Sequence, residues 1–301
     1  MSDERFLWPG SPNEQAPPAF TPGGGGRRRV VLAGAIALAA AGVVALVLVL
    51  AGGDAPPGSL SSNAVVRAAS ATNAQAGYQF AMDIGVTVAG RSVAIQATGV
   101  VTERPQVVLS MDMAIAGATY TAVFAPPWEY IQAGGNWFKI DRDSYEQAIG
   151  AGGLSPTNND PSQLLHFLAA TGTVTRVGTE AIRGVQTTHY HAVTELSRYA
   201  ATVPASERQA AAASIATLER DLSATTLPID AWVDDQQRVR RISFAASGIC
   251  TTSGPADEAI TMDFFDYGPQ AAPAIPSDAA DITSQAARAA AAGSQQTPCS
   301  A

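Results

Sequence analysis

An uninterrupted apolar run near the N-terminus constrains this chain more than any other feature. Residues 30–50 carry no charged or polar side chain, and the run continues directly into Ala51-Gly52-Gly53-Asp54. A helix rises about 1.5 Å per residue, so roughly 20 apolar residues cross a hydrocarbon core of about 30 Å. A secretory signal has a shorter apolar region, and a buried core helix of a soluble domain keeps a polar face. The run therefore predicts a transmembrane helix over residues 30–51.

The charges that flank this run predict its orientation. Arg27, Arg28 and Arg29 precede it and Asp54 follows it. The positive-inside rule then places the N-terminus in the cytoplasm and the rest of the chain outside the cell membrane, as a single-pass protein. A lipoprotein signal needs a cysteine just after the apolar run, and the first cysteine is Cys250. Lipidation at this end is therefore not expected.

The composition predicts four further segments in the rest of the chain: an N-terminal tail, a linker, a domain and a C-terminal tail. Residues 1–29 are rich in Pro and Gly and poor in aliphatic side chains, which predicts a disordered cytoplasmic tail. Residues 52–62 read as a linker. Residues 63–276 are long enough for one domain with an apolar core. The segment after Tyr267 is rich in Pro and Ala, and residues 277–301 are predicted to be mostly disordered.

Charge and cysteine content exclude some functions. The formal net charge of −8 argues against a nucleic-acid partner, which requires a basic surface. Cys250 and Cys299 both fall on the predicted outer side, where disulfides persist. A Cys250–Cys299 bridge and two free thiols both remain open, because the sequence does not give the distance between them.

The pattern after the linker changes to a period of two, which indicates strands. In "YQFAMDIGV" and in "VVLSMDMAI" alternate residues are apolar. Helices are indicated over "NDPSQLLHFLAATG" and over the alanine-rich stretch that starts near Pro204. The predicted fold is α+β, a long antiparallel sheet with helices on one face. The predicted strands cover residues 78–86, 107–115, 120–124, 137–140, 174–177, 187–193, 229–233, 239–244 and 260–265.

One face of the predicted sheet is apolar along its length and is the candidate binding site. Methionine is flexible and is over-used at adaptable apolar binding surfaces. Periodicity alone favours a closed core over an open groove. The candidate ligand-binding residues on the sheet and on the covering helix are Phe80, Met82, Leu109, Met111, Met113, Leu165, Leu168, Met262 and Phe264.

Several sequence pieces resemble the LolA-like superfamily, and within it the actinobacterial envelope proteins of the LppX and LprG type. They are Gly184 with Thr188-His189-Tyr190, then Leu227-Pro228-Ile229 with Trp232-Val233-Asp234, and Asp266-Tyr267-Gly268. The resemblance covers roughly residues 64–276. It implies a curved, incomplete β-barrel around helices, with an apolar cavity for acyl chains, and it raises the groove interpretation above the closed core.

The chain departs from that family in its predicted anchor. Many relatives are anchored by a lipidated cysteine, whereas an uncleaved span would tether this protein and favour local lipid presentation over shuttling. The first hypothesis is therefore a non-catalytic lipid-binding domain outside the membrane. The alternative is an envelope sensor or assembly partner that acts through protein contacts without a small ligand.

No motif indicates catalysis, a metal site or a cofactor. His189 and His191 lie on one face of a strand, but no third ligand follows at a standard spacing. The acidic pairs Asp141 with Asp143 and Asp234 with Asp235 lie at predicted turns, where carboxylates are normally solvated. No nucleophile elbow or phosphate-binding glycine loop occurs. We therefore expect neither an enzyme nor a metalloprotein.

Overall fold

The computed structural model describes residues 64–88, 90–102, 107–142, 144–145, 170–202, 205, 208–251 and 254–294. The predicted tail, transmembrane helix and linker, and most of the helix predicted from Asp160, lie outside these residues. Within the described part of the chain, no helix has the length and apolarity that crossing a membrane requires.

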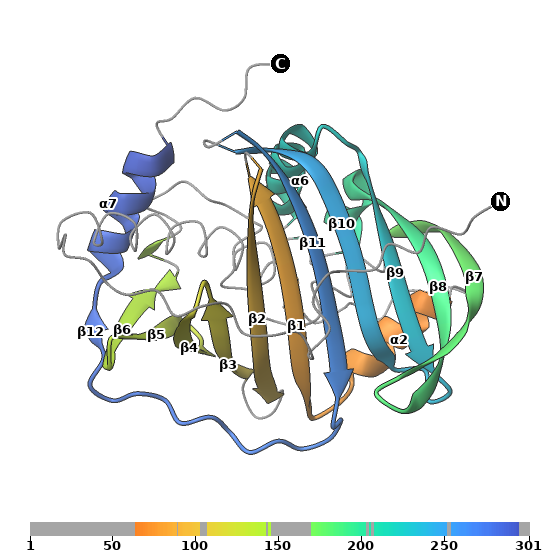
Figure 1. The fold of residues 1–301 in the computed structure, drawn as a ribbon, viewed down its shortest axis with the longest axis horizontal. Coiled ribbons are helices and arrows are strands. Elements are labelled where there is room, and N and C mark those ends of the chain that lie inside the picture. Colours follow the sequence, from red (N-terminus) through yellow and green to blue (C-terminus); the bar gives the residue numbers. More distant parts are fainter. Residues whose placement is uncertain are drawn as a thin grey trace. The chain divides into compact units, whose positions relative to one another are not determined.

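The described strands form one large, curved, mostly antiparallel sheet (Figure 1). The strand order is β12-β6-β5-β4-β3-β2-β1-β11-β10-β9-β8-β7, and only the β12–β6 pair is parallel. The end strands β12 and β7 do not pair, so the sheet is not closed. The strands are β1 (Gly77–Val88), β2 (Arg91–Thr102), β3 (Val108–Ile115), β4 (Ala118–Ala125), β5 (Trp128–Ala133), β6 (Asn136–Asp141), β7 (Thr171–Ile182), β8 (Val185–Glu195), β9 (Thr226–Asp234), β10 (Val239–Thr251), β11 (Gly254–Phe265) and β12 (Ala280–Asp281).

Tight turns connect several hairpins and fix their register. Between β7 and β8, Arg183 and Gly184 both have positive φ, at 50° and 79°. Two successive residues with positive φ are typical of the type I′ turn, whose twist matches that of the flanking strands. Gly134 and Gly135 form the turn between β5 and β6.

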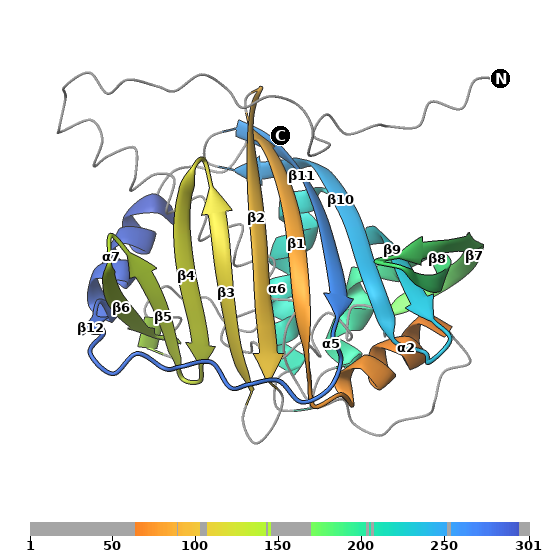
Figure 2. The same ribbon diagram turned by 60° about the horizontal axis from the view of Figure 1, so that its bottom comes forward.

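The described helices are few and cover only part of the sheet. They are α2 (Ala64–Asn73), the short η1 (Leu196–Arg198) and α5 (Tyr199–Thr202), α6 (Arg208–Leu222) and α7 (Thr283–Ser294). Helix α6 packs against β10, α2 packs against β9 and β10, and α7 packs against β6. Figure 2 shows α6 behind β1 and β11. The α+β fold class and the long antiparallel sheet agree with the sequence prediction.

The chain after β11 runs along one end of the sheet before it reaches β12 and α7 (Figure 2). Where this segment begins, the backbone N–H of Gly268 donates a hydrogen bond to Gly77 O at 2.9 Å. Farther on, Asp281 accepts hydrogen bonds from Thr283 N and Thr283 Oγ1 at 2.9 and 2.7 Å. This cap and an alanine-rich sequence stabilise α7. The segment predicted to be mostly disordered thus contains a strand and a helix.

Candidate functional site

The predicted ligand-binding residues on three strands share one face of the sheet, here called the inner face. Directly opposed residues of antiparallel strands point to the same side. One cross-strand row joins Met262 on β11, Met82 on β1, Ala97 on β2 and Met113 on β3. The next row consists of Phe264, Phe80, Gly99 and Met111, and beside it Leu109 lies opposite Val101. On the other side, a row of isoleucines contains Ile260, Ile84, Ile95 and Ile115.

These side chains lie inside the molecule. Phe80, Met82 and Met111 are 2–3% exposed. Leu109, Met113 and Phe264 are also buried, and Met262 is partly buried. Leu165 and Leu168 lie outside the described residues. A buried side chain can either line a cavity or fill a core, so the ligand-binding role of this face stays a prediction.

In the middle of β2, the inner face carries two small residues, Ala97 and Gly99. A Cβ atom at Gly99 would lie 2.5 Å from the Phe80 ring, so this ring rests on the β2 backbone. Ala97 lies between Met82 and Met113. Of the chain's 5 methionines, every one except Met1 is on the inner face. The flexible methionine side chains of β1 and β3 therefore flank a strip of β2 that carries only the small residues Ala97 and Gly99.

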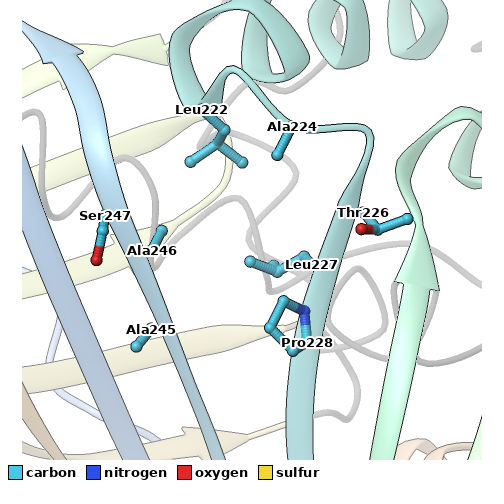
Figure 3. A pocket seen from close by; sticks show the side chains of 8 residues that line it. All are labelled: Leu222, Ala224, Thr226, Leu227, Pro228, Ala245, Ala246 and Ser247. Atoms are coloured by element: carbon cyan, nitrogen blue, oxygen red, sulfur yellow. The ribbon is translucent and has the colours of Figure 1, made fainter.

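A pocket opens where β9 and β10 separate. The last β9–β10 pair at this end is Ile229 with Phe244, while β9 continues beside β8 as far as Thr226. The pocket has a volume of about 180 Å³. Figure 3 shows Leu222, the last residue of α6, and Ala224, in the loop that follows, above the gap between the two strands. The other lining residues are Thr226, Leu227, Pro228, Ala245, Ala246 and Ser247.

A buried carboxyl group that sequence reasoning missed lies on the inner face. Glu258 on β11 is 8% exposed, and its Oε1 atom has no hydrogen-bond partner among the described residues. Burial raises the pKa of Glu258 to about 7. The signal was present in the sequence, because Glu258 precedes Ile260 and Met262 at a spacing of two.

The two histidines considered as metal ligands share a carboxylate on the opposite, outer face. His189 Nε2 and His191 Nδ1 lie 2.8 and 3.1 Å from Asp230 Oδ1. The His189 ring stacks on Trp232 with a centroid distance of 4.3 Å. Among the described residues, no three His, Cys, Asp or Glu side chains form a group that could hold a metal ion. This cluster holds β8 against β9.

The other acidic residues considered for catalysis have structural partners. Asp234 accepts hydrogen bonds from Arg238 N and Arg240 Nε at 2.8 and 2.7 Å. Burial alone would raise the pKa of Asp234, but these donors outweigh it and lower that pKa. Asp141 Oδ1 accepts a hydrogen bond from Ser144 N at 2.9 Å. Asp235 is exposed, and Asp143 lies outside the described residues.

A buried ion pair joins the end of β6 to β5. Arg142 Nη1 lies 2.7 Å from Glu129 Oε2, and both side chains are 8% exposed. Burial raises the pKa of Glu129, and the Arg142 charge only partly offsets this. The pair holds the chain after β6 against β5, which is a structural role.

Only one cysteine of the possible Cys250–Cys299 bridge belongs to the described residues. Cys250 belongs to β10, and Cys299 lies outside the described residues. The Cys250–Cys299 bridge therefore stays a prediction.

Comparisons with known proteins give matches among solved structures. No family model matches the chain, and no curated protein matches it. The crystal structure of the Mycobacterium tuberculosis lipoprotein LppX matches with a TM-score of 0.44 and 12% identity, covering 70% of this chain and 98% of LppX. LprF from Mycobacterium bovis matches with a TM-score of 0.45 and 14% identity, covering 70% and 94%.

A LolA superfamily protein from Nitrosomonas europaea also matches, with a TM-score of 0.26 and 9% identity, covering 71% of this chain and 96% of that protein. The solved structures that match this chain thus include the lipoprotein LppX and a LolA superfamily protein.

Proposed function

We propose that this chain binds the acyl chain of a lipid or acylated molecule against its inner face and catalyses no reaction. The observation that supports this function is the row Met262, Met82, Ala97 and Met113. Methionine side chains adapt to ligands of different shape, and Ala97 leaves room between two of them. Each methylene group of a bound chain that leaves water contributes about 0.8 kcal/mol to binding.

The proposed location is the outer side of the cell membrane, with residues 30–51 as the anchor. A tethered domain stays within reach of its own membrane. The protein therefore receives or presents lipid locally and does not carry it over a distance. Such a role requires an apolar surface and an entrance, and it requires no catalytic group.

The test starts from full-length protein purified from its native membrane, with bound lipid measured by mass spectrometry. Ala97→Leu fills the strip between Met82 and Met113, so we expect it to displace lipid and to leave the melting temperature near that of the wild type. Ala94→Leu is the matched control, because Ala94 is exposed on the other face of the same strand. We expect its lipid load to be unchanged.

A second pair of variants tests the apolar character of the site. Met111→Asp places a charge on the inner face and should reduce the lipid load, as should Leu109→Asp. Ala114→Asp, on the exposed side of β3, is the control. If the wild type carries no lipid and Ala97→Leu lowers its melting temperature by overpacking, the inner face is a filled core and the proposal is wrong.

A further inference from the structure

Glu258 occupies a position where an apolar side chain would be expected. The register places it between Val86 on β1 and Ala246 on β10. Alternate residues of a strand share a face, so Glu258 lies on the same face as Ile260 and Met262. The neighbouring Val86 and Ala246 side chains contain no hydrogen-bonding group, and Glu258 Oε1 has no partner among the described residues.

An unpaired buried carboxyl group destabilises the domain that contains it. Transfer of a polar group from water without a compensating hydrogen bond is unfavourable, and a charged group costs more. A ligand that brings a hydrogen-bond donor to Glu258 removes this penalty when it binds. Above about pH 7, where Glu258 is ionised, the same carboxyl group would repel an anionic ligand group, because two negative charges in a medium of low dielectric constant disfavour each other.

The pocket between β9 and β10 reaches the row of Glu258. Ala246 lines that pocket, and it is the cross-strand partner of Glu258. Directly opposed residues of an antiparallel pair have Cβ atoms about 5 Å apart. Figure 3 shows Ala246 on β10 at this opening, below the end of α6. A polar group that enters between the two strands therefore arrives beside the carboxyl group.

The remaining rows of β11 suit the apolar part of the same ligand. Beyond Glu258, the inner face continues through Ile260 and Met262 to Phe264. At about 3.3 Å per residue, the distance from Glu258 to Phe264 is roughly 20 Å. The face thus has a carboxyl group at one end and an apolar surface long enough for an extended acyl chain.

We propose that Glu258 binds the polar end of an amphipathic ligand by accepting a hydrogen bond from a hydroxyl or ammonium group. The ligand's chain then lies along Ile260, Met262 and Phe264. This proposal rests on the lipid-binding function proposed above and adds the ligand class: hydroxylated or cationic, and not anionic, at this end.

The experiment is run at a pH well above 7, where Glu258 is ionised, and offers full-length protein an equimolar mixture of three alkyl probes of equal chain length. One ends in a hydroxyl group, one in an ammonium group and one in a carboxylate, and the retained probes are measured by mass spectrometry. We expect the wild type to retain the alcohol and the amine over the fatty acid by on the order of tenfold, the effect of one hydrogen bond to a charged group.

Two substitutions separate the contributions of charge and hydrogen bonding. Glu258→Gln keeps an acceptor and should lose the preference for the amine while it keeps that for the alcohol. Glu258→Leu should lose both preferences and should not impair folding, because it removes an unpaired polar group. Asp257→Asn is the control, since Asp257 is exposed and accepts a hydrogen bond from Gly248 N at 3.0 Å.

Different results contradict different proposals. Equal probe ratios in the wild type and Glu258→Leu, or a preference of the wild type for the fatty acid, would overturn the role of Glu258 and leave the lipid-binding function intact. Failure of the wild type and all variants to retain any probe would overturn the proposed function itself.

Discussion

Asp234 and Glu258 are both buried acids, but their surroundings give them opposite protonation behaviour. Desolvation by burial raises the pKa of either group. At Asp234, hydrogen bonds from the Arg238 backbone and from Arg240 and Arg238 side chains outweigh desolvation and lower the pKa. Among the described residues, no donor reaches Glu258 Oε1, and burial raises the pKa of Glu258 to about 7. The Asp234 carboxyl group is therefore satisfied within the protein, whereas Glu258 Oε1 has no hydrogen-bond partner among the described residues.

The raised pKa of Glu258 predicts a specific pH dependence of stability. In the unfolded chain this group has its ordinary pKa of 4.5. Between about pH 4.5 and 7 the folded state keeps a proton that the unfolded state releases. The free energy of unfolding therefore falls as the pH rises through this window and levels off above it. At about 1.4 kcal/mol per pKa unit, the total effect is on the order of 3 kcal/mol.

Glu258→Gln removes this contribution, so the difference in stability between the variant and the wild type should grow in favour of the variant from pH 4.5 to pH 7. The neighbouring Val86 and Ala246 do not titrate and add nothing to it. The measurement is the unfolding of the full chain in detergent at a series of pH values, with Asp257→Asn as the control. Parallel stability curves for the wild type and Glu258→Gln would contradict the prediction.

At single residues, alternation predicted the inner face well and failed where a charge interrupted it. Tyr78, Phe80, Met82 and Ile84 on β1 are apolar at every second position and are buried. Glu258 follows the same alternation, but it lies beside Asp257, and two adjacent acidic residues normally indicate a solvent-exposed segment. The packing that buries Glu258 includes Val86 on β1, which is distant in sequence, so composition alone could not show it.

Among the elements, the β7–β8 hairpin is fixed to the outer face by side chains near its turn. Arg183 Nε donates to Asp263 Oδ2 at 3.1 Å, and the Arg183 guanidinium lies 4.1 Å from the centroid of the Phe265 ring. Trp232 Nε1 donates a hydrogen bond to Glu180 Oε1. The type I′ turn places Arg183 at the hairpin tip, so contacts across several strands hold the end of the sheet.

Asp263 is expected to contribute more to stability than Arg183. Asp263 also accepts a hydrogen bond from Arg241 Nη2 at 2.8 Å, and its side chain is 11% exposed. Asp263→Ala leaves the half-buried Arg241 without this partner and should cost about 2–3 kcal/mol. Arg183→Ala removes one contact of a side chain that is 45% exposed and should cost less than about 1 kcal/mol.

The two variants are compared by chemical denaturation and by hydrogen exchange. Arg183→Ala should increase exchange mainly at the hairpin tip, around residues 180–187, whereas Asp263→Ala should also affect β10 and β11. If Arg183→Ala destabilises the protein as much as Asp263→Ala does, the prediction is wrong. The Arg183–Asp263 contact would then contribute more to stability than the exposure of Arg183 indicates.

Strand prediction succeeded where large side chains alternate and missed strands built from small or mixed residues. The strands around residues 78–86 and 107–115 are confirmed as β1 and β3. Strand β2 was not predicted, because its inner positions include Ala97 and Gly99, which carry little hydrophobic signal. Gly99 is small because Phe80 from the next strand occupies the space above it. This requirement is a tertiary contact, which periodicity within one strand cannot reveal.

For the whole molecule, α6 packs against β10 and lies behind β1 and β11 (Figure 2). Helix α2 packs against β9 and β10, and α7 packs against β6. The methionine-bearing strands β3, β1 and β11 lie between β6 and β10 in the strand order. The proposed ligand site thus occupies the central strands, with Glu258 and the β9–β10 opening toward one side.

The proposed anchor gives a prediction that is independent of the ligand. If residues 30–51 span the membrane and are not cleaved, an N-terminal epitope tag and a C-terminal reporter enzyme that is active only outside the cytoplasm remain on one membrane-bound polypeptide. Substituting Arg27, Arg28 and Arg29 by glutamate removes the positive charge that holds the N-terminus inside. We expect this variant to lose most of its reporter activity.

A triple substitution of the neighbouring glycines Gly23, Gly24 and Gly25 by serine is the matched control, because it changes the same tail without changing its charge. Its reporter activity should equal that of the wild type. A mature protein that lacks the N-terminal tag would mean that the apolar run is a cleaved signal. The domain would then be free to diffuse, and carriage of lipid over a distance would replace local presentation as the expected role.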